Sequence, residues 1–313
     1  MNAVLAAAAS VVPIVAVFAG GVIFARRKII AAADSAVLSE FVFRLAVPAY
    51  LFAQLYAADL AVLFEPHSLS VYAATALFAA AVVAAWARFA HRADVRGIAL
   101  RIMAAVQVNS AYFAIPVLVL FFGDATPILP VLLFQVLVFT MLVVAVMEAT
   151  TARGGPAPAW RRAAAGAGRS LLTPVVVACL AAVALNAAAA PVPAVLLRSC
   201  EFAGAAAAPV ALFALGLYLG GVGLRWRGAA PGENTLVAVK CVLFPLLMWA
   251  AMNLAGVPEP WRGSLVLIAA MPAPQNLFTI AQAYDTDVEL AAAAVVKSTI
   301  LALCLLPMWR LLL

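Results

Sequence analysis

The sequence predicts an all-α membrane protein in which ten transmembrane helices form two inverted repeats of five helices each. The first reason is composition: 68% of the residues are apolar, the mean hydropathy is +1.13, and only 10% of the residues are charged. The second is an internal repeat in the spacing of prolines, because Pro13 and Pro174, and likewise Pro48 and Pro209, are 161 residues apart. The third is an uneven distribution of basic residues among the loops. A bilayer accounts for the composition, and an internal duplication accounts for the repeated proline spacing.

Apolar segments long enough to cross a bilayer recur along the whole chain, with short polar breaks between them. A helix of about 20 residues spans the hydrocarbon layer, which sets the segment length to look for. The expected spans are residues 4–24, 37–57, 69–87, 100–122, 128–149, 171–189, 200–222, 235–255, 264–283 and 290–312.

The first apolar segment is expected to remain as a helix rather than to be cleaved as a signal peptide. A secretory signal carries its basic residues before its apolar stretch. Here Arg26, Arg27 and Lys28 follow the apolar stretch, and no basic residue precedes it. We therefore expect the N-terminus outside the cell.

Basic residues gather in every second loop of this ten-span arrangement. Cytoplasmic loops of bacterial membrane proteins carry an excess of Lys and Arg. With the N-terminus outside, 13 of the 19 basic residues fall in cytoplasmic loops. They are Arg26, Arg27, Lys28, Arg88, Arg92, Arg96, Arg101, Arg153, Arg161, Arg162, Arg169, Arg225 and Arg227. The formal charge of +6 thus belongs to the membrane face, and no nucleic-acid partner follows from it.

The 161-residue spacing divides the chain into two repeats of five spans each. Because five is odd, the second copy lies upside down in the membrane relative to the first, which is typical of secondary transporters. The expected units are residues 1–149, a cytoplasmic linker at 150–169 rich in Gly, Pro, Ala and Arg, and residues 170–313.

The fourth and ninth spans combine proline with side-chain amides deep inside apolar segments. The fourth contains Asn109 and Pro116, and the ninth contains Pro272, Gln275 and Asn276. Proline interrupts a helix, and a buried amide needs a partner. Proline kinks with amides bonded to a neighbouring helix are one interpretation. Unwound stretches that bind a ligand are the favoured one, because the pattern occurs in equivalent spans of both repeats.

The same residues carry a family resemblance. The segment from Asn109 to Pro116, the pair of P-x-x-L-F-A motifs at 48–53 and 209–214, and the close of the last span make the chain resemble the auxin efflux carrier family of bacterial permeases and plant carriers. The resemblance covers essentially all ten spans. The long central hydrophilic loop of the plant carriers is missing, so hormone transport is not expected.

The resemblance implies a fold in which the fourth and ninth helices are unwound and cross each other between a scaffold domain and a transport domain. It also implies an organic-anion substrate, in bacterial members often a dicarboxylate such as malonate or malate. A carboxylate needs hydrogen-bond donors, which the amides and hydroxyls of these spans provide. The expected substrate-binding residues are Asn109, Ser110, Tyr112, Phe113, Pro116, Pro272, Gln275, Asn276, Thr279 and Lys297.

Formal charges inside the spans form a second group of candidates. Lys240 is expected to extend its ammonium to the cytoplasmic interface, as long basic side chains do. Lys297 is about as close to that interface but stands next to Ser298 and Thr299 on the last span, and a cation at bilayer depth costs about 3 kcal/mol unless it is compensated. We expect either a substrate carboxylate or the cluster of Asp287 and Glu289 to compensate it.

Several other classes of site are not expected. The four cysteines are far apart, so neither a disulfide framework nor a metal site is predicted. Gly216, Gly220, Gly221 and Gly223 lack a phosphate-loop lysine and are expected to allow close helix packing. No nucleotide-hydrolysis or nucleophile motif appears, so the chain is not expected to be an enzyme or to need a cofactor.

These observations predict a multi-pass protein of the bacterial inner membrane, with both termini outside, that carries small organic anions. Mono- or dicarboxylates such as malonate or malate, or auxin-like acids, are the expected substrates, and Na⁺ or H⁺ is the candidate coupling ion. The expected partners are the anion and the lipid bilayer, with homodimer formation left open. The alternatives are a ligand-sensing receptor or scaffold with a carrier fold, and a sodium-coupled symporter or antiporter of another organic anion.

Overall fold

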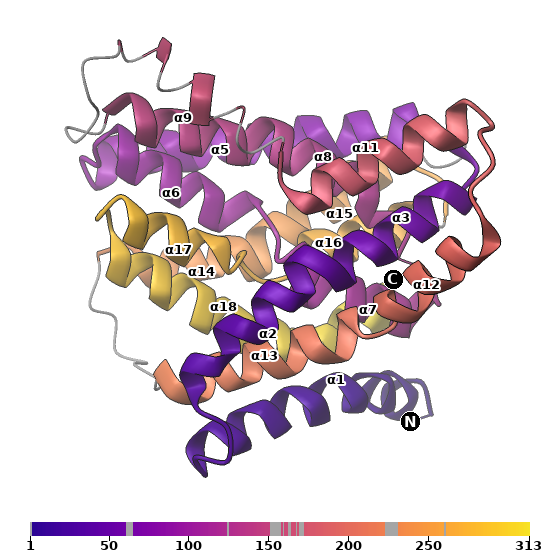
Figure 1. The fold of residues 1–313 in the computed structure, drawn as a ribbon. Coiled ribbons are helices and arrows are strands. Elements are labelled where there is room, and N and C mark those ends of the chain that lie inside the picture. Colours follow the sequence, from indigo (N-terminus) through magenta and orange to yellow (C-terminus); the bar gives the residue numbers. More distant parts are fainter. Residues whose placement is uncertain are drawn as a thin grey trace.

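A computed structural model of the chain shows a bundle of helices whose two termini lie at the same end (Figure 1). It describes residues 2–60, 65–123, 125–150, 172–222, 231–259 and 261–313, together with 158, 160–161, 164–166 and 168. Within these ranges the side chains of residues 2–11, 111, 112, 222 and 310 lie outside the description. Every regular element in the described part is helical, as the all-α prediction requires.

Helices occupy the ranges that the hydropathy pattern predicts. Those of the N-terminal half are α1 (Asn2–Arg26), η1 (Ala32–Asp34), α2 (Ser35–Phe41), η2 (Val42–Ala46), α3 (Val47–Ala57), α5 (Pro66–Ala90), α6 (Val95–Val106), η3 (Ser110–Ala114), α7 (Ile115–Phe122), α8 (Ile128–Phe134), η4 (Gln135–Thr140) and α9 (Met141–Thr150). Those of the C-terminal half are α11 (Pro174–Ala187), α12 (Ala194–Gly204), α13 (Ala207–Val222), α14 (Glu233–Ala238), η5 (Val239–Leu243), α15 (Phe244–Leu254), α16 (Trp261–Ala269), α17 (Asn276–Ala283) and α18 (Val288–Leu312).

Six helical stretches in the described part are long and apolar enough to cross a membrane. They are Ala32–Ala57, Pro66–Ala90, Ile128–Thr150, Ala194–Gly221, Glu233–Leu254 and Val288–Trp309. Two shorter apolar helices cover Val12–Arg26 and Pro174–Ala187. The fourth and ninth predicted spans do not reach this length because each is divided into two short helices, so the count of ten remains a prediction.

Local chemistry sets where several helices begin. Glu65 precedes α5, and its carboxylate accepts hydrogen bonds from the backbone N–H groups of His67 (3.1 Å) and Ser68 (2.6 Å). The interaction with Ser68 lowers the pKa of Glu65, because these donors favour the charged form. Asp94 caps α6 in the same way through the N–H of Gly97 at 2.8 Å. These caps satisfy N–H groups that have no partner inside a helix.

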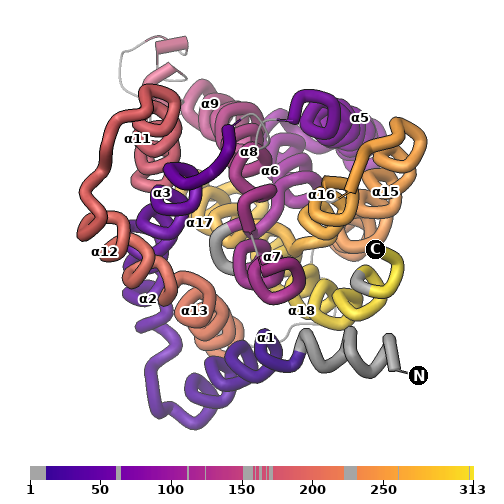
Figure 2. Tube along the Cα trace, turned by 90° about the vertical axis from the view of Figure 1, so that its right-hand side faces the viewer, coloured from indigo at the N-terminus to yellow at the C-terminus, as the bar shows by residue number. Residues whose placement is uncertain are grey.

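The helices separate into two groups. In Figure 2, α2, α3, α11, α12 and α13 gather on one side, whereas α5, α15, α16 and α18 lie on the other. Within the first group α11 packs along α3, and α1 packs along α13 from outside that group. Within the second, α5 packs on α6 and on α15, and α15 packs on α16.

Glycine allows α1 and α13 to approach backbone to backbone. A Cβ atom added to Gly216 of α13 would lie 2.1 Å from the carbonyl oxygen of Phe18, and one added to Gly21 of α1 would lie 2.3 Å from that of Phe213. Gly220 and Gly221 are equally close to residues of the first repeat. The prediction that these glycines serve close packing is therefore confirmed, while Gly223 lies outside the described residues.

A polar contact joins α11 to the end of α3. The side-chain amide of Asn186 donates to the carbonyl oxygens of Tyr56 (2.7 Å) and Ala58 (2.8 Å), which have no partner further along the helix. The Tyr56 hydroxyl donates in return to the carbonyl oxygen of Ala190 at 2.9 Å. These bonds fix the position of the sixth predicted span relative to the second.

Polar contacts also tie together the helix ends that the charge pattern places in the cytoplasm. Arg101 of α6 forms an ion pair with Asp287, in the turn before α18. The Tyr284 hydroxyl, at the end of α17, donates to the Glu148 carboxylate of α9 at 2.9 Å. Arg96, at the start of α6, donates to the hydroxyl of Thr150 at 2.8 Å. Helices of both halves of the sequence are thus joined at this end.

Candidate functional site

Two interrupted helices meet in the interior of the bundle. The first is α6–α7, which is broken at residues 107–109, and the second is α16–α17, which is broken at residues 270–275. Figure 1 shows α6 and α17 toward one end of the bundle, and α7 and α16 toward the other. The backbone N–H of Asn109 donates to the carbonyl oxygen of Pro272 over 2.9 Å, so the two breaks touch through their main chains.

A network of side-chain amides supports the first break. Gln107 donates to the hydroxyl of Thr140 (2.8 Å) and to the carbonyl oxygen of Gln135 (2.9 Å). The Gln135 side chain accepts from the N–H of Val108 (3.2 Å) and donates to the Tyr72 hydroxyl (2.9 Å). Backbone groups freed by the break must find partners in an apolar interior, and these side chains provide them.

Asn109 also begins a widened helical turn. Its carbonyl oxygen accepts from the N–H of Ala114 at 2.9 Å, which is the spacing of a π-helical turn. Pro116 follows in the first turn of α7, where its missing N–H leaves no bond unmade. The unwound stretch therefore ends at Asn109, and the widened turn connects it to α7, where Pro116 lies.

Ser298 of α18 supports the second break. Its hydroxyl accepts a hydrogen bond from the backbone N–H of Ala273 at 3.0 Å. Ala273 lies between Pro272 and Pro274, neither of which has an N–H to donate. Ser298 and Ala273 are both buried, so this hydroxyl holds the unwound chain where water is absent.

The structure places the predicted residues of the fourth span at the crossing. Asn109 is 2% exposed, Phe113 and Pro116 are buried, and Ser110 is half-buried, with its hydroxyl 3.4 Å from the carbonyl oxygen of Val108. The side chain of Tyr112 lies outside the described residues. The spacing that puts Asn109, Phe113 and Pro116 on one face thus matches three buried positions.

The predicted residues of the ninth span are less uniform. Pro272 is buried beside Asn109, and Gln275 is half-buried with its side-chain carbonyl oxygen enclosed but without a hydrogen-bond donor among the described residues. Asn276 and Thr279 lie on the exposed side of α17. The crossing therefore gathers Pro272 and Gln275 near the first break, while Asn276 and Thr279 line the exposed surface next to it.

Lys297 has a partner that the sequence did not indicate. Its ammonium forms an ion pair with the carboxylate of Glu233 and donates to the side-chain oxygen of Asn234 at 2.9 Å. The side chains of Lys297 and Glu233 are 5% and 2% exposed. The expectation that Asp287 compensates Lys297 is wrong, because Asp287 pairs with Arg101 instead. Glu233 stands two residues before the predicted span, where an acidic residue looks like an ordinary helix start.

The prediction that Lys240 extends to the interface is also wrong. Its side chain is buried, its ammonium donates to the carbonyl oxygen of Ala269 at 3.3 Å, and it lies 5.0 Å from the centre of the Phe244 ring. Ala269 is the last residue of α16. Lys240 thus reaches inward to the second break, a direction that its distance from the end of the span could not reveal.

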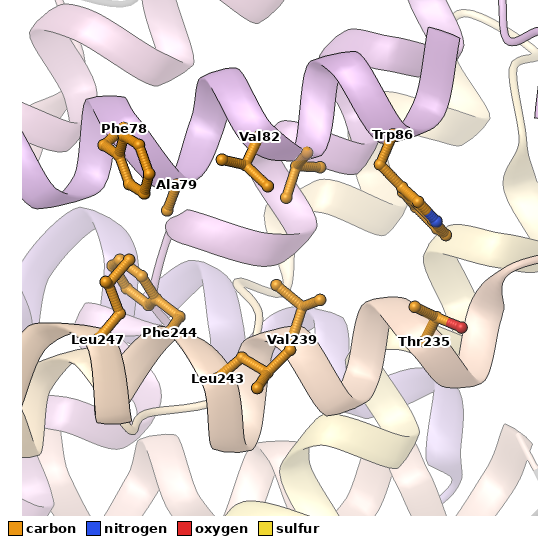
Figure 3. Close-up of a pocket in the computed structure, with 10 residues that line it drawn as sticks. Phe78, Ala79, Val82, Trp86, Thr235, Val239, Leu243, Phe244 and Leu247 are labelled. Atoms are coloured by element: carbon orange, nitrogen blue, oxygen red, sulfur yellow. The ribbon is translucent and has the colours of Figure 1, made fainter. Parts of the chain in front are cut away.

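A cavity of about 220 Å³ opens between two helices away from the crossing. Figure 3 shows its walls, which are formed by α5 and by the stretch from α14 to α15. The lining side chains are Phe78, Ala79, Val82, Val83, Trp86, Thr235, Val239, Leu243, Phe244 and Leu247. No charged side chain is among them, so this cavity suits apolar groups rather than an ionised acid.

The crossing offers a different chemistry. Unwound backbone, side-chain amides and a buried ammonium come together there inside an apolar bundle, which is how membrane carriers hold polar ligands near mid-membrane. Among the described residues no group of His, Cys, Asp or Glu has the arrangement of a metal site.

Comparison with known proteins supports a transport role. Residues 166–310 match the family described as "Membrane transport protein". A protein of Rhizobium meliloti (strain 1021), named "Putative malonate transporter", is 39% identical over 114 residues, which are 36% of this chain and 34% of that protein. The match thus spans about a third of the length of this relative. Both similarities are to membrane transport proteins, in agreement with the resemblance found in the sequence.

Proposed function

We propose that this multi-pass membrane protein, whose residues 166–310 belong to the membrane transport protein family, is a secondary carrier of small organic anions. Its substrates are mono- or dicarboxylates, with malonate and malate first and auxin-like acids second. Malonate stands first because the similar Rhizobium meliloti protein bears that substrate in its name. The carrier works by alternating access, with the two interrupted helices as its binding region.

The contact between Asn109 and Pro272 carries this proposal. Discontinuous helices are costly in a membrane, because every freed backbone group must be satisfied. Here two of them meet, and dedicated side chains such as Gln135 and Ser298 support them. A protein that only anchored or assembled in the membrane would have no need for paired breaks, whereas a carrier binds its ligand at such a place.

Helix packing supports the inverted repeat with units at 1–149 and 170–313. The first span, α1, packs along the seventh, α13, and the sixth, α11, packs along the second, α3. These two pairs exchange under a rotation that swaps the repeats, as two related halves require. Third and eighth spans, α5 and α15, contact each other directly, as equivalent elements beside such an axis would. All ten segments would then cross the membrane.

The charge pattern sets the proposed orientation. The two chain ends in Figure 1 lie at one end of the bundle, and the arginines of the loop between α5 and α6 belong to helix ends at the other. Because basic loops remain in the cytoplasm, both termini lie outside the bacterial inner membrane.

Energy for transport comes from a gradient of Na⁺ or H⁺ or from the anion itself. Neither break contains an acidic residue, so exchange of cations on a carboxylate at the crossing is disfavoured. The buried Glu233 is paired with Lys297 rather than facing the breaks. Na⁺ would be held by backbone carbonyl and amide oxygens, which the unwound stretches provide.

Flux measurements in proteoliposomes test the proposal. The purified full chain is reconstituted and supplied with labelled malonate, malate, succinate or an aromatic carboxylate under imposed Na⁺, proton or voltage gradients. Saturable uptake of at least one acid, absent from empty liposomes, is expected. Binding without flux across the whole panel would instead indicate a ligand-sensing receptor. Dependence on one gradient alone identifies the coupling ion.

A further inference from the structure

Two buried lysines, Lys240 of η5 and Lys297 of α18, differ in whether a carboxylate lies beside them. Lys297 faces the carboxylate of Glu233, which balances its charge. Lys240 is 1% exposed, and its contacts are the carbonyl oxygen of Ala269 and the face of the Phe244 ring. In the part of the chain that the structure describes, Lys240 makes no ion pair with a carboxylate. When it is protonated, its charge is therefore not balanced by an anionic side chain among the described residues.

Lys240 lies about two helical turns inside its span. It follows Glu233, the first residue of α14, by seven positions, which corresponds to about 10 Å along a helix. A cation at that depth is costly unless a negative group accompanies it. The C-terminal carbonyl groups of α16 carry only part of a charge of about one half, which is too little to balance an ammonium.

The ammonium also has hydrogen-bonding capacity left. A protonated lysine has three N–H donors, and one of them is used by Ala269 at 3.3 Å. The acceptor Ala269 immediately precedes the unwound residues 270–275, so the unused donors are at the edge of the second break. The Phe244 ring, 5.0 Å away, covers another side of the ammonium and also lines the apolar cavity of Figure 3.

We infer that Lys240 is the cationic residue that binds a carboxylate group of the transported acid at the crossing. This inference rests on the proposed function and deepens it, because it requires an ionised substrate. The carboxylate of the incoming acid accepts hydrogen bonds from the two unused N–H groups of the Lys240 ammonium and balances its charge. The ion pair of Lys297 and Glu233 then serves the packing of α18 against α14 and does not contact the acid.

A purely structural role for Lys240 makes different predictions. If the ammonium only caps α16, its loss would lower stability and the amount of active protein without altering affinity for the acid. Lys240→Gln separates the two roles, since the glutamine amide can still donate to a carbonyl group but carries no charge. Lys240→Arg keeps the charge with a different shape.

Binding of malonate to the purified full-length protein in detergent, measured by titration calorimetry, tests the inference directly. Charge-assisted hydrogen bonds are strong, so Lys240→Gln should weaken malonate binding about tenfold to a hundredfold. Lys240→Arg should retain most of the affinity. The matched control is Arg262→Gln, which removes an exposed cation of α16 that pairs with Glu259 and should bind malonate as the unaltered protein does. Unchanged affinity in Lys240→Gln would overturn the inference.

A second measurement on the unaltered protein covers the case in which Lys240→Gln fails to fold. Acetic anhydride labels lysine amines, and mass spectrometry compares Lys240 with Lys297. Saturating malonate should slow the labelling of Lys240 about tenfold and leave that of Lys297 unchanged, because a carboxylate would cover the unused donors. Equal labelling of Lys240 with and without malonate would contradict the inference. Malonate binding without flux would refute the carrier and leave the binding residue intact, so the two failures are distinguishable.

Discussion

The ammonium of Lys297 on α18 forms a buried ion pair with the carboxylate of Glu233 at the start of α14. The two residues are 64 positions apart in the chain, and Asn234 adds a hydrogen bond of 2.9 Å to the same ammonium. Breaking a buried pair leaves one charge without a partner, which costs more than removing both charges together. This difference makes the pair a sensitive probe of the fold.

Lys297→Met should destabilise the protein strongly, by about 3–5 kcal/mol, because Glu233 would remain buried and unpaired. The double variant Glu233→Gln/Lys297→Met should recover most of that loss. Thermal unfolding in detergent measures both. The matched control is Glu40→Gln, which breaks the exposed pair with Arg44 and should change stability by at most about 1 kcal/mol. Equal effects of the single and double variants would show that the pair contributes no coupling.

Ser298→Ala should weaken the second break. The variant leaves the buried N–H of Ala273 without its acceptor at 3.0 Å, at a cost of about 1–3 kcal/mol. Thr299→Val is the neighbouring control, since the Thr299 hydroxyl donates to Val295 within its own helix. The melting temperature and the malonate flux should both fall in Ser298→Ala and change little in Thr299→Val. A larger loss in Thr299→Val would mean that the second break does not depend on Ser298.

Gly216→Ala should disturb the contact between α1 and α13, because the added Cβ atom would lie 2.1 Å from the backbone oxygen of Phe18. Gly20→Ala provides the matched control, as its Cβ atom would meet nothing within 4 Å, and alanine favours a helix by about 1 kcal/mol over glycine. The yield of folded protein after detergent extraction and its melting temperature report the effect. A Gly216→Ala protein as stable as Gly20→Ala would contradict the close approach.

Asn109→Ala should strongly reduce transport and leave insertion intact. The backbone N–H that donates to Pro272 is present in every residue except proline, so the variant keeps the contact between the breaks and loses only the side-chain amide. Malonate flux per folded molecule should drop at least about tenfold, as expected for loss of a ligand hydrogen bond in an apolar site. Chromatography of the solubilised protein checks folding. Wild-type flux in this variant would move the site away from the fourth span.

Much of the architecture could be predicted because a bilayer imposes simple rules. Apolar length identifies the spans, and the predicted range 100–122 corresponds to α6 and α7 with the break where Asn109 and Pro116 indicate one. No phosphate-loop lysine follows the glycines at 216, 220 and 221, which predicts a packing role, and their contacts with α1 and with Ala32 agree. Each of these predictions depends on local sequence and on the solvent, which is the same all along the chain.

Partners across the fold could not be predicted in the same way. The side chain of Gln135 supports the break at Val108 from a different helix, and no spacing in the sequence connects them. The position of Lys240 along its helix predicts that it reaches the interface, whereas the side of the helix on which it lies turns it inward to Ala269. A charged residue inside a span has several partners within reach, and only packing selects one.

The sequence by itself determined the membrane environment, the helical ranges, the positions of the two breaks and the likeness to a family of transport proteins. Tertiary structure alone decided that the breaks touch through Asn109 and Pro272, and that Glu233 rather than Asp287 neutralises Lys297. The physical reason is the separation along the chain over which each effect acts. Hydropathy and helix interruption act over a few neighbouring residues, but burial of a charge or an amide is settled by whichever distant group the packed helices bring beside it.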